Sequence, residues 1–206
     1  MDNFALEKDI HSAGLIILGE LQVTDNDPVP KEAQSILLLG PDEPNFWAIF
    51  KESEEFNDLN ANPLDRWSKR VIDNIAVQND CTALYPFGEE PYKPFFSWAI
   101  RSGTVWSSPV HLAIHKDRGL LVSFRGALAI NQIKKTNQSF ENPCTACPAP
   151  CLSACPVNAF TETGYDVVKC KDHISGLDSS SCKSFGCNTR RACPVGANLR
   201  NSEQSA

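Results

Sequence analysis

Eight of the nine cysteines in this 206-residue chain fall within its last 63 residues, at spacings typical of a metal-binding module. The first four form the run Cys144-Thr-Ala-Cys147-Pro-Ala-Pro-Cys151-Leu-Ser-Ala-Cys155-Pro156. The other four are Cys170, Cys182, Cys187 and Cys193. Thiolates are soft ligands that suit zinc and iron-sulfur clusters. Eight thiolates are the number that two four-thiolate sites require.

The spacing C-x2-C-x3-C-x3-C-P differs by one residue from the C-x2-C-x2-C-x3-C-P run of bacterial ferredoxins. In two-cluster ferredoxins the fourth cysteine binds the other cluster. A weak internal repeat supports the same exchange here, because Ala154-Cys155-Pro156-Val157 returns as Ala192-Cys193-Pro194-Val195. We therefore expect one [4Fe-4S] cluster at Cys144, Cys147, Cys151 and Cys193, and a second at Cys155, Cys170, Cys182 and Cys187. Four-cysteine zinc sites also begin with C-x2-C, so a zinc-stapled module is the alternative.

The remaining sequence predicts an α+β protein with two domains, residues 1–135 and residues 136–206, joined by the polar segment 131–142. Apolar runs at 14–19 and 35–40 predict strands of a central sheet, and shorter strands are expected at 110–115, 120–124 and 127–130. A helix is predicted to begin at Asn62 as N-cap, with Pro63 in its first turn. Cys81 is expected to be a buried, unreactive side chain.

Charge and hydropathy restrict the class of protein. The formal net charge of −6 gives no uniform basic field for nucleic acid or anionic lipid. No apolar stretch approaches the roughly 20 residues of a membrane-spanning helix, and the first residues lack the pattern of a secretion signal. We expect a cytoplasmic protein without a membrane partner. The uneven distribution of cysteines argues against a disulfide scaffold.

Seven aromatic residues gather between positions 85 and 106: Tyr85, Phe87, Tyr92, Phe95, Phe96, Trp98 and Trp106. Such a surface suits a planar ligand, with Tyr85, Phe87, Phe95 and Trp98 as the candidate cofactor residues. The alternative is that these side chains pack in the core. His111 and His115 share one face if residues 110–115 form a strand, and either imidazole could approach a cofactor.

The chain resembles the epoxyqueuosine reductases and, more distantly, the reductive dehalogenases. The resemblance lies in residues 144–160, in Val168-Lys169-Cys170 and in the Gly186-Cys187 and Cys193-Pro194 pairs. It implies a nitroreductase-like, corrinoid-binding N-terminal domain followed by a two-cluster ferredoxin domain. Residues 115–126 are also similar to cobalamin-processing chaperones of the CblC type, although Lys116 stands where those proteins tend to have proline. That similarity adds His115, Gly119, Arg125 and Gly126 as candidate cofactor residues.

Three functions follow as hypotheses. The first is an iron-sulfur electron-transfer protein that relays electrons to a partner protein or to a group held by the N-terminal domain. The second is a corrinoid-dependent or flavin-dependent reductase, for which the resemblance leaves tRNA open as a partner; no catalytic residue is assigned. The third is a zinc-stapled binding module.

Overall fold

A computed structural model describes residues 3–43, 45–133, 139–176 and 180–199. Its contacts divide the chain into two compact units. One comprises Met1–Thr104 and Ser123–Ser139, and we call it the sheet unit. The other comprises Val105–Val122 and Phe140–Ala206, and we call it the cysteine unit. Residues 105–122 thus group with the C-terminal region, whereas the sequence boundary was expected at residue 135. Residues 134–138 of the expected linker lie outside the described residues.

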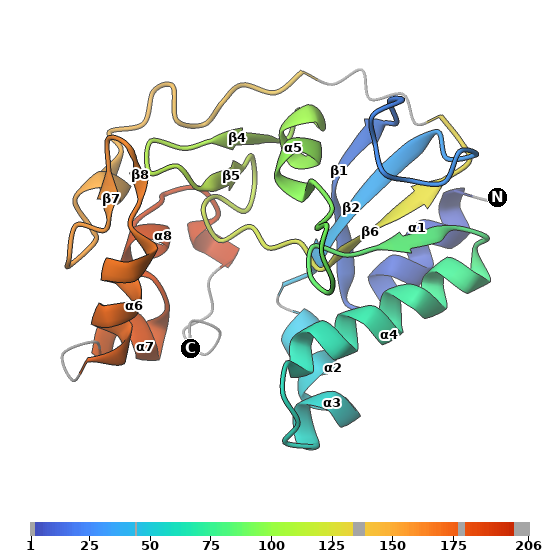
Figure 1. The fold of residues 1–206 in the computed structure, drawn as a ribbon, viewed down its shortest axis with the longest axis horizontal. Coiled ribbons are helices and arrows are strands. Elements are labelled where there is room, and N and C mark those ends of the chain that lie inside the picture. The colour runs from blue at the N-terminus through green and yellow to red at the C-terminus, as the bar shows by residue number, and fades with distance from the viewer. Residues whose placement is uncertain (1–2, 44, 134–138, 177–179, 200–206) are drawn as a thin grey trace. The chain divides into compact units, whose positions relative to one another are not determined.

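An antiparallel sheet of four strands forms the centre of the sheet unit (Figure 1). Its order is β1 (Leu15–Gln22), β2 (Ser35–Pro41), β6 (Gly126–Ile130) and β3 (Thr82–Leu84). The α+β class and the strands expected at 14–19, 35–40 and 127–130 are confirmed. In β2 and β6 nearly every residue is buried. Their continuous apolar sequences reflect this position, because both faces of these strands are covered.

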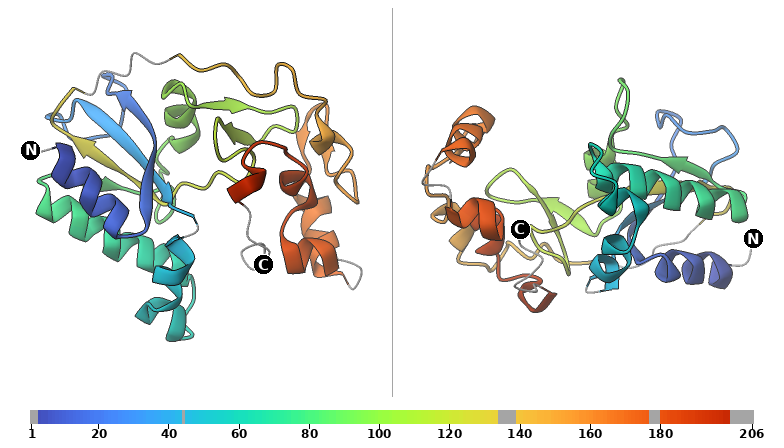
Figure 2. Two further views of the ribbon diagram at one scale, coloured as in Figure 1. Left: turned by 180° about the vertical axis from the view of Figure 1, so that it is seen from behind. Right: turned by 90° about the horizontal axis from the view of Figure 1, so that it is seen from below.

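The main core lies between one face of the sheet and the helices α1 (Asn3–Ser12), α2 (Asn45–Lys51) and α4 (Pro63–Gln78). Figures 1 and 2 show these helices beside the sheet, and the short α3 (Glu54–Asn57) precedes α4. The predicted helix start is confirmed, since Pro63 occupies the first turn. Asn62 nevertheless adopts a left-handed backbone with φ of 53° and makes no side-chain cap hydrogen bond.

The helix α5 (Phe95–Arg101) packs near β1, where its C-terminal end approaches the strand. Thr104 Oγ1 donates a 2.9 Å hydrogen bond to the Leu18 carbonyl. A Cβ at Gly19 would lie 2.6 Å from Ser102 Oγ, so this close approach requires glycine. Asp27 fixes the loop between β1 and β2 to the same helix, because Trp98 Nε1 donates to it at 2.7 Å.

The cysteine unit consists of short elements joined by loops. It contains two hairpins, β4 (Val105–Ser107) with β5 (Ala113–His115) and β7 (Phe160–Thr161) with β8 (Gly164–Tyr165). Its helices are α6 (Val167–Ser175), α7 (Ser180–Phe185) and α8 (Asn188–Arg191), with 3-10 turns η1 (Pro150–Leu152) and η2 (Ala197–Leu199). None of the helices in the described ranges is both long and apolar enough to span a bilayer.

Two strand predictions in this region are wrong. The strand expected at 110–115 is limited to residues 113–115, since His111 lies in a turn with φ of +58° and is not on a strand face with His115. Residues 120–124 form no strand. Leu120 and Val122 are buried, so this apolar run fills the interior without pairing to a neighbouring strand.

Candidate metal centre

Four cysteine side chains, three from one loop and one from more than 40 residues later, line one small apolar cavity in the cysteine unit. Cys144 and Cys147 lie in the loop before η1, Cys151 lies in η1, and Cys193 follows α8. These are the four residues that the ferredoxin pattern assigned to one cluster. The rest of the cavity is lined by Ser108, Pro109, Ile114, Leu120, Pro143, Ala149, Pro150, Pro194 and Val195.

The electrostatics of the four thiols also reflect their proximity. Burial raises the pKa of Cys144, and the neighbouring Cys147, Cys151 and Cys193 raise it further. Burial likewise raises the pKa of Cys151, followed by the effect of Cys193. The thiolates of Cys144 and Cys151 are therefore disfavoured by burial and by the neighbouring cysteines. A cation or a cluster with its own positive iron ions removes this repulsion when it binds and releases the thiol protons.

The local backbone is arranged to support sulfur ligands. Ala149 adopts a left-handed conformation with φ of 51°, and its N–H donates to Cys147 Sγ at 3.4 Å. The N–H of Cys144 donates to Asn142 Oδ1 at 2.9 Å, which fixes the start of the loop. Prolines at 143, 148 and 150 limit the conformations of the same loop. The thiols thus project from a segment whose backbone is held in place.

The β4–β5 hairpin supplies one wall of the cavity. Val110, Ile114 and Leu120 form a buried cluster with Cys151 and Cys193. Sequence analysis missed this wall, because the hairpin lies more than 20 residues before the first ligand and carries no cysteine.

Two glycines allow the turn that follows β5, residues 116–119, to approach Cys193 closely. A Cβ on Gly119 would collide with the Val195 carbonyl oxygen and lie 3.1 Å from Cys193 Sγ. A Cβ on Gly196 would lie 2.7 Å from the Asp117 carbonyl oxygen. Both glycines have positive φ, 57° and 70°. Gly119 and Gly196 lie on opposite sides of the contact between residues 117–119 and residues 193–196. They are the sequence signal that could have indicated this contact.

The buried His115 shapes this turn. Its Nδ1 accepts hydrogen bonds from the backbone N–H groups of Asp117 and Arg118, at 3.1 and 3.2 Å. A ring nitrogen that accepts hydrogen bonds carries no proton. His115 therefore holds the turn through an unprotonated Nδ1. Gly119 closes the same turn by pairing its backbone with that of His115.

The second predicted set is spread over more of the chain: Cys155 lies between η1 and β7, and Cys170, Cys182 and Cys187 lie in α6, in α7 and at the N-cap of α8. Tyr165 is hydrogen-bonded to Cys170, and this bond, burial and the charges of Cys170 and Cys187 raise the pKa of Tyr165 to about 12. Cys182 lies in α7, which is linked to α8 by a 2.8 Å hydrogen bond from Ser181 Oγ to Asn188 Oδ1. Cys155 Sγ accepts from the Ala159 N–H at 3.3 Å.

Four thiols are a donor set whose type and number suit both an iron-sulfur cluster and a structural zinc ion. Among the described residues, no three histidine, cysteine, aspartate or glutamate side chains are close enough to hold a single metal ion.

The candidate residues for an N-terminal cofactor are divided between the two units. His115 and Gly119 belong to the cysteine unit, and the other six belong to the sheet unit. There, Phe95 and Trp98 are buried in mutual contact, with ring centroids 5.2 Å apart. The cofactor role of all eight residues stays a prediction.

The others of this group also have structural partners. Tyr85 donates to Asp73 Oδ1 at 2.6 Å and its ring lies 5.3 Å from that of Phe87. Arg125 Nη1 lies 3.3 Å from Asp65 Oδ1. A Cβ on Gly126 would lie 2.6 Å from Ile72 Cδ1, so this glycine lets β6 approach α4.

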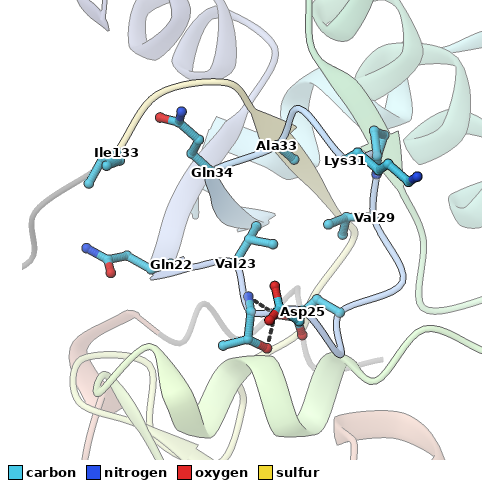
Figure 3. Close-up of a pocket in the computed structure, with 11 residues that line it drawn as sticks. Gln22, Val23, Asp25, Val29, Lys31, Ala33, Gln34 and Ile133 are labelled. Atoms are coloured by element: carbon cyan, nitrogen blue, oxygen red, sulfur yellow. Dashed lines mark hydrogen bonds between the residues drawn. The ribbon is translucent and has the colours of Figure 1, made fainter.

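A separate hollow in the sheet unit lies under the β1–β2 loop (Figure 3). It is lined by Gln22, Val23, Thr24, Asp25, Asp27, Val29, Pro30, Lys31, Ala33, Gln34 and Ile133. Its lining holds neither a cysteine nor a histidine, nor any of the candidate cofactor residues. Thr24 donates twice to Asp27, so these side chains mainly hold the loop in shape.

Comparisons of this chain with protein-family models, with curated proteins and with solved structures found no match.

Proposed function

We propose that this protein transfers electrons through two [4Fe-4S] clusters bound in its cysteine unit. The observation that carries the proposal is the convergence of Cys144, Cys147, Cys151 and Cys193 on one apolar cavity. Cys193 is separated from Cys151 by 42 positions, so local spacing alone does not bring it there. A [4Fe-4S] cluster supplies a centre that gains or loses one electron at a potential set by its surroundings.

The protein's own groups favour this use of the site. The N–H groups of Ala149 and Ala159 donate to Cys147 Sγ and Cys155 Sγ, one cysteine from each proposed set. Such hydrogen bonds stabilise thiolates and the more negative, reduced form of a cluster. The apolar walls formed by Ile114 and Leu120 limit access of water to the first set. The residues therefore support reversible electron transfer to a partner protein.

Iron and acid-labile sulfide analysis of the full chain, purified and reconstituted without oxygen, tests the proposal. We expect about eight irons and eight sulfides per chain, together with an absorption band that dithionite bleaches. Cys151→Ser should lower both contents by about half, whereas Cys81→Ser should leave them unchanged, because Cys81 lies in the sheet unit. Stoichiometric zinc without sulfide would instead establish the zinc-stapled module.

A further inference from the structure

The side chain of Thr189 is fully buried, yet its hydroxyl has no hydrogen-bond partner among the described residues. A buried hydroxyl without a partner is costly, and native structures rarely retain one without a reason. A helical threonine commonly donates to a carbonyl three or four residues earlier. Thr189, at the second position of the four-residue α8, does not.

Thr189 lies in a helix that packs against the segment carrying Cys151. That segment is η1, and Thr189 is the one buried residue of α8. In sequence Thr189 stands between Cys187 and Cys193, which belong to the two different proposed sets. Arg190 Nη1 donates to the Leu120 carbonyl at 3.3 Å, so α8 is also tied to the hairpin that walls the first set.

On the basis of the proposed function, we infer that the Thr189 hydroxyl donates a hydrogen bond to a sulfur of the first cluster, the one bound by Cys144, Cys147, Cys151 and Cys193. Thr189 is thus a positioning residue that stabilises the reduced form, because an O–H donor interacts more strongly as negative charge on the sulfur increases. Its removal should make that cluster harder to reduce. The other cluster should keep its potential, since one hydroxyl donates one proton.

The test compares three variants of the full, reconstituted chain by redox titration followed by electron paramagnetic resonance. Thr189→Val retains the shape and loses the donor, Thr189→Ser retains the donor, and Thr104→Val removes a buried hydroxyl in the sheet unit. We expect Thr189→Val to lower the equilibrium constant for one-electron reduction of one cluster about tenfold, a shift of about 59 mV. Thr189→Ser and Thr104→Val should match the unmodified protein.

A second set of titrations assigns the shift to a cluster. In a Cys170→Ser background, which leaves the first site intact, the shift caused by Thr189→Val should persist. If Thr189→Val loses its clusters, Thr189→Ala removes the donor without placing a methyl group where the hydroxyl was. Resonance Raman spectra provide an independent measurement. In the unmodified protein, exchange of the donated hydroxyl proton for deuterium should shift the iron-sulfur bands. Thr189→Ala should lose the part of this shift that the hydroxyl causes.

Three results overturn the inference. They are unchanged potentials in Thr189→Val, which a water molecule as the real partner would produce; equal shifts in the valine and serine variants; and a shift confined to the second cluster. In each of these cases iron and sulfide remain bound, so the proposed function stands. An unmodified chain that binds neither iron nor sulfide refutes the proposed function itself.

Discussion

Replacing Gly196 by alanine should open the loop that buries Cys193. Gly196 has φ of +70°, and a Cβ there would lie 2.7 Å from the Asp117 carbonyl oxygen and 3.0 Å from the Arg118 carbonyl carbon. The matched control is Gly103, whose φ is +73° and whose added Cβ would meet no atom within 4 Å. Both variants share the backbone cost of a left-handed alanine, about 1–2 kcal/mol. Only Gly196→Ala adds a collision with backbone, which cannot rotate away.

The collision contributes about 1–3 kcal/mol, the usual range for overpacking. That range corresponds to about a 5- to 150-fold change in the equilibrium between closed and open loop. Cys193 is 5% exposed, so its alkylation in the reduced, metal-free chain requires this opening. We expect Cys193 to be alkylated about 5- to 150-fold faster in Gly196→Ala than in Gly103→Ala, as measured by mass spectrometry. Equal rates would refute the packing of residues 117–118 against Gly196, whatever metal the site binds.

Three further predictions concern the sheet unit. Asp27→Asn should lower the free energy of unfolding by about 1.5–3 kcal/mol at pH 7, because the buried carboxylate loses its ion pair with Arg101. Burial alone would raise the pKa of Asp27, but hydrogen bonds from Arg101, Thr24 and Trp98 outweigh it and hold that pKa well below its usual value. The stabilisation is therefore complete above about pH 4, and unfolding titrations should show the difference between the two proteins shrinking at lower pH. Cys81 was expected to be buried, whereas the structure leaves it partly exposed. Its partial burial still raises its pKa to about 11, so it should react slowly with iodoacetamide at pH 7 and faster as the pH approaches 11; a fast reaction at neutral pH would contradict the raised pKa. Gly126→Ala should lower the midpoint of urea unfolding, because the added Cβ would lie 2.6 Å from Ile72 Cδ1; an unchanged midpoint would argue against close packing of β6 on α4.

Local sequence patterns predicted the sheet strands and the start of α4 well. A continuous apolar run such as residues 35–40 is typical of a strand whose two faces are both covered, and this run does form β2. The run at 120–124 is also mostly apolar, but its Leu120 packs near Cys151 and Cys193 instead of pairing with a strand. Nothing within five residues distinguishes these two environments, because the difference lies in what arrives from far along the chain.

The first cysteine set was predictable for a different reason. Cys144, Cys147 and Cys151 are close in sequence, so a single loop must keep them close in space. Cys193 was assigned through the repeated Ala-Cys-Pro-Val segment, and it does line the same cavity. The turn-holding role of His115 and the buried hydroxyl of Thr189 could not be predicted, since each depends on contacts rather than on residue type.

The chain passes between the two units three times, after residues 104, 122 and 139. During synthesis, the hairpin of residues 105–122 leaves the ribosome before β6, so the sheet cannot be completed until that hairpin is already exposed. The hairpin must then wait for Cys193 and Val195, some 70 residues later, before its apolar side chains are covered. A nascent chain interrupted between residues 130 and 190 would thus present a finished sheet and a hairpin whose apolar side chains are exposed. Chaperones would need to protect this state from aggregation.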